Sequence, residues 1–307
     1  MTDALPFKTT MTFAYGEPRQ LAPGIVRIVA NNPNHFTFKG TNTYLVGEDD
    51  LALIDPGPDD PSHLTAILSA LRGRRLTHIL ITHTHHDHVD GLPALIAATG
   101  AKTAGYGHKA RSRGAKRTSA AGGEYVEVDF VPDVALRHGD RLGGEGWSFE
   151  AIFTPGHAPD HLCFALQGSE LLFSGDHVMG WNTSVVAPPE GHMGAYIRSL
   201  ELLTERPERT YFPGHGGQIE EPQRLVKAYM LHRRMREQSI LECIKNGTNT
   251  ARTIVPVIYK GLDPKLLNAA TLSVLAHVEH LIERGLVRCD SPPSSSRLSS
   301  DHSLSPS

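Results

Sequence analysis

The chain has 307 residues, of which 39% are hydrophobic and 21% charged, and its formal net charge is -3. This length predicts one large domain or two, and the composition is that of a globular enzyme. A slightly acidic chain has no global field that would draw it to nucleic acid or to an anionic membrane. No apolar stretch approaches the ~20 residues that cross a bilayer, and the N-terminus lacks the apolar core of a secretory signal. We therefore expect a cytoplasmic protein without membrane contact.

Short apolar runs alternate with helical patterns over the first two thirds of the chain. Strands are expected at residues 24–30, 41–46, 51–54, 78–82, 147–153, 161–166, 171–174 and 210–212, and helices at 61–72, 91–99 and 193–205. Residues 105–123 are rich in Gly, Ser, Lys and Arg and are expected to form an exposed insertion. The alternation indicates a layered α/β architecture, and the hairpin signals argue against a purely parallel sheet.

The character of the sequence changes after Pro222. Helices are expected at 222–246 and 264–284, the segment 250–259 is short and β-branched, and 286–288 is a candidate strand. This pattern suggests a small appended domain of the winged-helix type. Residues 291–307 are mostly Ser and Pro, which predicts a disordered tail. We therefore divide the chain into residues 1–221, 222–290 and 291–307.

The motif that carries most information is Thr-His-Thr-His-His-Asp-His at residues 82–88, directly after an apolar strand. His83, His85, His88 and Asp87 lie at the spacing of metal ligands. Imidazole and carboxylate ligands together suit borderline divalent ions, zinc first, with manganese or iron as alternatives. A His-rich surface loop is the simpler interpretation, but the position of the motif behind a strand argues against it.

Three further candidate ligands, His157, Asp176 and His215, follow other predicted strands. Each lies beside a glycine, which allows the backbone to turn tightly and to approach a small centre. Loops that follow neighbouring strands can deliver such side chains to one rim of an α/β enzyme. Any one of the three could be a turn residue or a helix cap, but together they predict a metal site.

These motifs resemble the signature of the metallo-β-lactamase fold hydrolases. Thr82–His88, Thr154–His157, Ser174–Asp176 and Pro213–His215 resemble four of its five parts, and Asp55 in Leu53–Gly57 resembles the remaining one. The resemblance implies a four-layer αββα sandwich, two β-sheets flanked by helices. It also implies that His83, His85 and His157 bind a first metal, that Asp87, His88 and His215 bind a second, and that Asp176 bridges the two. His86 falls between ligand positions, and Asp55 would support the ligands from behind, unless it is only a turn-forming residue before Pro-Gly.

Further stretches narrow the resemblance to one group of this superfamily. Gly40–Gly47, Gly175–Ser184 and the helical segment 237–289 are similar to the β-lactamase-like protein 2 group, which has a winged-helix appendage. Its animal members are single-strand endoribonucleases, and some fungal relatives are thioesterases that act on polyketide chains. The resemblance therefore leaves the substrate open.

The expected activity is metal-dependent hydrolysis of an ester-type bond, with a metal-bound hydroxide as nucleophile and Asp87 as the catalytic residue that orients it. Single-stranded RNA as the partner would need a basic track, for which Lys109, Arg111, Arg113, Lys116 and Arg117 in one loop, and Arg233, Arg234 and Arg236 on a helix, are candidates. A solvated charged face is the simpler interpretation of these clusters. A small-molecule acyl thioester, as in the related glyoxalase II enzymes, would instead use residues 180–192 as an acyl pocket. Asn182, Thr183 and Ser184 would then bind a substrate oxygen, unless they serve only as turn residues.

A DNA-binding regulatory module that uses the winged helix is the alternative from outside enzymology. The predicted helix 264–284 argues against it, because its only Lys or Arg residues are Lys265 and Arg284. A recognition helix usually needs several side chains that contact phosphates and bases. We expect instead that the appendage covers one side of the active-site groove or forms a contact in a homodimer. β-Lactam hydrolysis is a weak alternative, since no export signal is evident.

Overall fold

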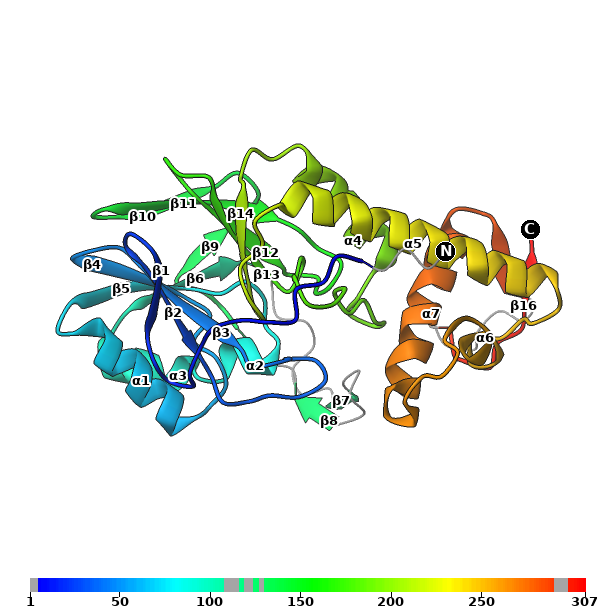
Figure 1. Cartoon of the computed structure of the whole chain (residues 1–307), viewed down its shortest axis with the longest axis horizontal. Coiled ribbons are helices and arrows are strands. Elements are labelled where there is room, and N and C mark those ends of the chain that lie inside the picture. Colours follow the sequence, from blue (N-terminus) through cyan, green and yellow to red (C-terminus); the bar gives the residue numbers. More distant parts are fainter. Residues whose placement is uncertain (1–4, 108–115, 119–123, 127–129, 290–297) are drawn as a thin grey trace.

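The structure is a computed structural model that describes residues 5–107, 116–118, 124–126, 130–289 and 298–307. Two β-sheets face each other in one lobe of the molecule, and the C-terminal helices form a second lobe (Figure 1). The larger sheet contains, in spatial order, β1 (Arg19–Ala22), β2 (Ile25–Val29), β3 (Asn42–Val46), β4 (Asp50–Ile54), β5 (Arg75–Leu80), β6 (Lys102–Tyr106) and β9 (Val134–Leu136). The smaller sheet contains β10 (Arg141–Gly144), β11 (Trp147–Phe153), β12 (Leu162–Leu166), β13 (Leu171–Gly175) and β14 (Thr210–Pro213).

The inner faces of the two sheets share an aromatic core. Phe149, Phe164, Phe173 and Phe212 from the smaller sheet pack with Tyr44 from β3, and all five are at most 2% exposed. The Tyr44 hydroxyl donates to the carbonyl of Pro213 at 2.7 Å, so its one polar atom is satisfied inside this core. Burial on both faces explains why the central strands are nearly continuous apolar runs.

Helices cover both outer faces and complete the sandwich. α1 (Pro61–Leu71) and α3 (Leu92–Thr99) pack on the larger sheet, and α4 (Met193–Thr204) and the first half of α5 (Pro222–Lys245) pack on the smaller one. The short α2 (His86–Val89) lies in the 82–88 motif. The predicted four-layer αββα sandwich is confirmed, and the sequence boundaries of α1, α4 and α5 agree with the observed ones to within one residue.

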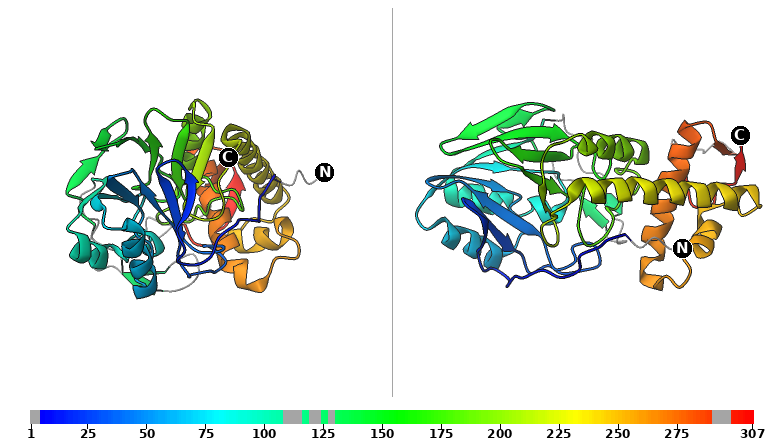
Figure 2. Two further views of the ribbon diagram at one scale, coloured as in Figure 1. Left: turned by 60° about the vertical axis from the view of Figure 1, so that its left-hand side comes forward. Right: turned by 45° about the horizontal axis from the view of Figure 1, so that its top comes forward.

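Helix α5 belongs to both lobes, and Figure 2 shows it running from the sandwich into the C-terminal lobe. There it packs with α6 (Ala251–Ile258), the 3₁₀ helix η1 (Pro264–Leu266) and α7 (Leu267–Glu283) around a second apolar core. The β-branched segment 250–259 is thus helical for most of its length. Its helix begins at a capping box in which the side chains of Thr250 and Thr253 each bond the other's backbone N–H.

The expectation of a disordered tail is wrong for its last part. β16 (Leu304–Pro306) pairs antiparallel with β15 (Val287–Cys289), and Leu304 is 2% exposed in the C-terminal core. Three residues paired through their backbones need no apolar periodicity, so composition alone did not reveal them. Residues 290–297 lie outside the described residues, and the domain boundaries drawn from the sequence stay predictions.

The expected insertion at 105–123 is described only in part. β7 (Lys116–Thr118) lies in this range and pairs with β8 (Glu124–Val126), just after it, as a separate two-stranded ribbon. Residues 108–115 and 119–123 lie outside the described residues, and with them Lys109, Arg111 and Arg113 of the predicted basic loop.

Candidate metal centre

The predicted ligands follow four strands from both sheets. The 82–88 motif follows β5 of the larger sheet, whereas His157, Asp176 and His215 follow β11, β13 and β14 of the smaller one. Glycines allow these loops to approach one another. A Cβ on Gly214, for example, would lie 2.4 Å from Asp176 Oδ1, a separation that a real side chain does not adopt.

The first ligand group is His83, His85 and His157. His85 Nδ1 lies 3.0 Å from His83 Nε2 and 3.0 Å from His157 Nε2. Three tetrahedral ligands on one zinc ion would be separated by about 3.3 Å, given Zn–N bonds of about 2.0–2.1 Å. The three nitrogens therefore converge at the separation that a shared divalent ion requires.

The second ligand group is Asp87, His88 and His215. Asp87 Oδ2 lies 3.3 Å from His88 Nε2 and 3.2 Å from His215 Nε2, and these two nitrogens are 3.3 Å apart. Asp176 lies between the two groups, since its Oδ2 is 3.3 Å from His215 Nε2 and 3.7 Å from His157 Nε2. Its Oδ1 is buried and lies 3.4 Å from His88 Nε2, so the carboxylate faces ligands of both groups.

Each of the five histidines has an oxygen acceptor beside its other ring nitrogen. His83 Nδ1 lies 3.0 Å from Thr82 Oγ1, His85 Nε2 3.3 Å from Glu190 Oε2, His157 Nδ1 2.6 Å from the Val185 carbonyl, His88 Nδ1 2.8 Å from Asp55 Oδ2, and His215 Nδ1 3.2 Å from the Gly40 carbonyl. An imidazole that donates its N–H outward presents its lone pair inward. The residues therefore fit a centre of divalent metal ions, because neutral histidines held in this way are the form that binds metal.

Burial sets the protonation of two members of the first ligand group, His83 and His157. Burial, helped by the neighbouring imidazoles of His88 and His85, holds the pKa of His83 well below its ordinary value. Burial also lowers the pKa of His157 to about 4. His83 and His157 are therefore neutral near pH 7 and can offer lone pairs.

Carboxylates reverse this effect in the second ligand group. Burial alone would lower the pKa of His215, but Asp176 and Asp87 raise it to about 9. Burial would likewise raise the pKa of Asp176, yet His215 and His88 hold it well below its usual range. Protons balance the buried carboxylates in the metal-free protein, and divalent ions can take their place.

Asp55 lies directly behind the second ligand group, and its role as a supporting residue stays a prediction. It is 1% exposed, its Oδ1 accepts the Thr82 backbone N–H at 2.8 Å, and its Oδ2 accepts the Thr82 hydroxyl at 2.7 Å. The same Oδ2 contacts His88 Nδ1, as given above. Asp55 thus connects the strand end at β5 to one ligand of the centre. His86, in contrast, pairs with Asp90 at 2.9 Å and lies outside the ligand groups.

The predicted substrate residues divide into exposed and buried members. Asn182 is exposed and Thr183 is half-buried, whereas Ser184 is 2% exposed and its carbonyl accepts from Arg233. Asn182 and Thr183 are therefore the members of this trio that an incoming molecule can reach. Their contact with substrate stays a prediction.

Two further residues of the site were not predicted from the sequence. Thr41 donates its hydroxyl to Asp87 Oδ2 at 3.0 Å and is itself held by Asn32, whose side chain bonds both its backbone N–H and its hydroxyl. Glu190 contacts His85, as given above. Thr41 lies in the Gly40–Gly47 stretch directly before β3, and this position could have marked it as a site residue. No neighbouring residue marks Glu190 as a partner of His85.

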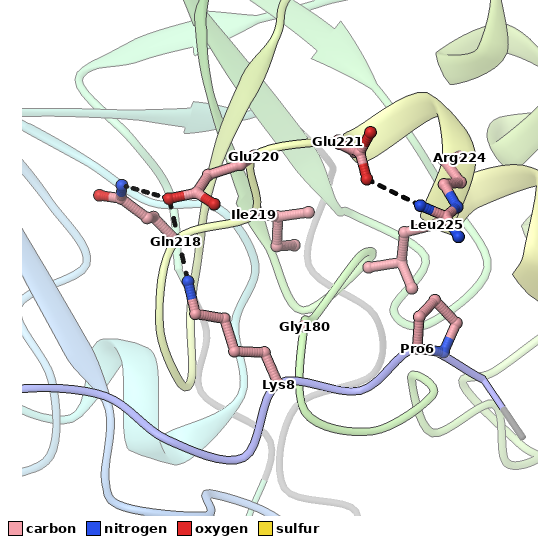
Figure 3. A pocket seen from close by; sticks show the side chains of 9 residues that line it. All are labelled: Pro6, Lys8, Gly180, Gln218, Ile219, Glu220, Glu221, Arg224 and Leu225. Atoms are coloured by element: carbon pink, nitrogen blue, oxygen red, sulfur yellow. Dashed lines mark hydrogen bonds and ion pairs between the residues drawn. The ribbon is translucent and has the colours of Figure 1, made fainter.

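A surface pocket lies apart from the two ligand groups, between the N-terminal segment and the start of α5 (Figure 3). Pro6, Ile219 and Leu225 give it an apolar floor, and Lys8 approaches Glu220 at 3.9 Å across its rim. None of its lining residues is a predicted ligand, and we assign it no part in the chemistry.

Comparison with known families agrees with the geometry. The protein-family model described as Metallo-beta-lactamase superfamily matches residues 36–215 of the sequence. A second family model, described as Beta-lactamase associated winged helix domain, matches residues 250–292. The chain belongs to the metallo-β-lactamase superfamily. It is therefore a hydrolase of this fold with a C-terminal winged-helix domain. The superfamily uses divalent metals, for which the two ligand groups supply His and Asp side chains.

Curated relatives cover most of the chain. It is 33% identical over 283 residues to the Beta-lactamase-like protein 2 homolog of Drosophila melanogaster, a match that covers 88% of this chain and 91% of that protein. It is 32% identical over 237 residues to the atrochrysone carboxyl ACP thioesterase of Aspergillus fumigatus, covering 76% of this chain and 69% of that protein. The resemblance to the β-lactamase-like protein 2 group is thereby confirmed.

Solved structures extend the likeness to the whole fold. A beta-lactamase domain protein from Burkholderia ambifaria matches with a TM-score of 0.76 at 18% identity, covering 100% of this chain and 96% of that one. A second protein, solved in a di-iron-bound form, matches with a TM-score of 0.50 at 25% identity and covers 66% of this chain and 97% of that one. Among the described residues, no helix combines the length and apolar character needed to cross a membrane.

Proposed function

We propose that this chain is a dinuclear metallohydrolase that cleaves acyl thioesters. The first ligand group would hold one ion, the second ligand group the other, and Asp176 would contribute a carboxylate oxygen to each. The observation that carries the proposal is the orientation of five histidines whose outer nitrogens bond oxygen acceptors and whose inner nitrogens converge. A relative solved with two iron ions supports the count of two. Zinc is our first choice because the donor set is imidazole and carboxylate.

Two divalent ions would activate a water molecule and polarise the oxygen of the bond under attack. The chain's own residues would place that water. Asp87 is the most exposed acidic ligand, since its side chain is 27% exposed against 9% for Asp176. The Thr41 hydroxyl donates to Asp87 Oδ2, the oxygen that also faces His88 and His215. Asp87 is therefore the residue that we assign to orienting the nucleophile beside the incoming substrate.

The choice of a thioester rests on a relative and on the basic side chains. The Aspergillus fumigatus relative is named a thioesterase. Of the helical basic cluster, Arg233 is 3% exposed and lies over the Tyr196 ring, and Arg236 lies 4.1 Å from the centre of the Tyr259 ring. Arg233 is therefore removed from any phosphate-binding track at the surface, which leaves the cluster incomplete and disfavours RNA on this helix.

Single-stranded RNA remains the second candidate because of one aromatic pair. Phe38 and Trp181 stack with ring centres 4.7 Å apart and an interplanar angle of 10°, and Lys39 Nζ lies 5.1 Å from the Phe38 ring. A Cβ on Gly216, the neighbour of His215, would lie 2.8 Å from Trp181. An aromatic pair flanked by a cation beside the centre is a feature that nucleobases can use. The DNA-binding alternative has less support, since Arg284 pairs with Glu237 at 3.0 Å.

The experiment compares both substrate classes on the zinc- and manganese-loaded protein. Short acyl-thioesters and a short single-stranded RNA are assayed in parallel with Asp87→Ala, and with Asp49→Ala as a matched control. Asp49 is exposed in the turn between β3 and β4, whereas the site lies at the other end of these strands. Thioester turnover that is lost in Asp87→Ala and kept in Asp49→Ala supports the proposal. RNA cleavage without thioester turnover, or normal activity of Asp87→Ala, would refute it.

A further inference from the structure

The loop that leads into α4 contacts the ligands of the first metal from outside. This 182–192 loop, from Asn182 to His192, supplies the Val185 carbonyl to His157 Nδ1 at 2.6 Å and the Glu190 carboxylate to His85 Nε2 at 3.3 Å. Two of the three histidines in the first ligand group are thus oriented by one loop. The third, His83, is oriented by its own neighbour Thr82.

The two contacts differ in kind. The carbonyl of Val185 orients the His157 ring. Because this carbonyl belongs to the backbone, a substitution of the Val185 side chain would not remove it. Glu190 is a partly buried carboxylate, with its side chain 15% exposed, beside a His85 side chain that is 31% exposed. A carboxylate on the outer nitrogen fixes the imidazole tautomer and makes the inner nitrogen a stronger electron donor. In the metal-free protein the same charge opposes the effect of burial, and the pKa of His85 is raised.

Helix α5 holds this loop in place. The Tyr229 hydroxyl is shared between the carbonyls of Met179 and Asn182, and the buried guanidinium of Arg233 donates to the carbonyl of Ser184. At the end of the loop, His192 Nε2 lies 2.9 Å from Glu283 of α7. The C-terminal helices therefore contact the first ligand group through the 182–192 loop.

We propose that Glu190 is a positioning residue for the first metal, acting through His85, and that α5 fixes the loop that carries it. This inference rests on the proposed dinuclear centre. It assigns to the 182–192 loop a role in metal binding, in addition to any contact of Asn182 and Thr183 with substrate. It also gives the C-terminal helices an effect on the centre that requires no contact between them and the metal.

The test measures metal binding on the full chain, with Zn²⁺ competed by a chromophoric chelator and with Co²⁺ as a visible spectroscopic probe. Glu190→Gln keeps the length and one oxygen acceptor but removes the charge, and Glu190→Ala removes both. Glu201→Gln on the exposed face of α4 is the matched control. We expect about 10–100-fold weaker binding of one Zn²⁺ for Glu190→Ala, a smaller loss for Glu190→Gln, and an altered Co²⁺ spectrum for both.

Tyr229→Phe tests the role of α5, because it removes only the hydroxyl, which lies between the carbonyls of Asn182 in the loop and of Met179 just before it. We expect it to weaken the same Zn²⁺ by about fivefold, the equivalent of one hydrogen bond. Wild-type Zn²⁺ affinity and an unchanged Co²⁺ spectrum in both Glu190 variants would overturn the inference, and unchanged binding by Tyr229→Phe would overturn the part assigned to α5. Fewer than two ions on the unaltered chain would instead refute the dinuclear centre itself.

Discussion

The sharpest prediction concerns Asp55, which we expect to control the protonation of His88. Its Oδ1 accepts the Thr82 N–H, while its Oδ2 accepts the Thr82 hydroxyl at 2.7 Å and lies 2.8 Å from His88 Nδ1. Asp55→Asn preserves the size of the side chain. Its amide oxygen can keep the bond to the Thr82 N–H, which places the amide nitrogen where Oδ2 was.

That nitrogen is a donor and therefore requires His88 Nδ1 to accept. The proton of a neutral His88 then moves to Nε2, which points toward Asp87 and His215 and can no longer bind a metal. Loss of such an outer partner weakens metal binding by about 10–100-fold, or about 1.4–2.7 kcal/mol. The metal-free protein should lose about 1–3 kcal/mol of stability, because a buried charged acceptor is replaced.

The assay counts the Zn²⁺ ions that remain after equilibration with a competing chelator. The unaltered chain should keep two ions and Asp55→Asn about one, with a far-UV circular dichroism spectrum unlike that of an unfolded chain. Asp49→Asn, a substitution of the same type in an exposed turn, should keep both ions. Two ions bound with unchanged affinity by a folded Asp55→Asn protein would refute the reasoning on the tautomer.

Two further predictions concern the C-terminal lobe. Val274 of α7 is 0% exposed in the apolar core, so Val274→Asp should lower the melting temperature and cost about 3–5 kcal/mol through an unpaired buried charge; unchanged melting and activity would count against this packing. Burial lowers the pKa of His277 to about 4. The unfolded chain then binds more protons, so stability falls by up to about 1.4 kcal/mol per pH unit as the pH drops from 6.5 toward 4. Urea titrations at pH 7 and pH 5 should show a smaller loss for His277→Leu than for the unaltered chain, and equal losses would contradict the assignment.

The positions of the candidate ligands could be predicted because their signals are local. At Asp176, for instance, an apolar run at 171–174 is followed by Gly175 and the acid, and the observed strand ends only one residue later. Helix ends were equally local, since Pro222 begins α5 and Asn246-Gly247 follows its last turn. Sequence periodicity and turn chemistry therefore sufficed for most elements that carry the site.

The partners behind the ligands could not be predicted in this way. Glu190 is 105 positions away from His85, and the Gly40 carbonyl is 175 positions away from His215. These contacts exist only after the two sheets have packed and the loops have met, and no pattern of neighbouring residues encodes them. The sequence places Glu190 only within residues 180–192, the stretch expected to form an acyl pocket.

The ligands come from both sheets, and this has a thermodynamic consequence. In the first ligand group His83 and His85 follow a strand of the larger sheet and His157 one of the smaller, and the second group is divided in the same way. An ion that binds only when the sheets are packed stabilises that packing, by about 2.7 kcal/mol at a free concentration of 100 Kd. The converse also holds, because residues such as Asp55 and Glu190 hold the histidines in position before an ion arrives. The candidate metal centre thus lies at the interface of the two sheets, and a substitution that loosens their packing should weaken metal binding by both ligand groups together.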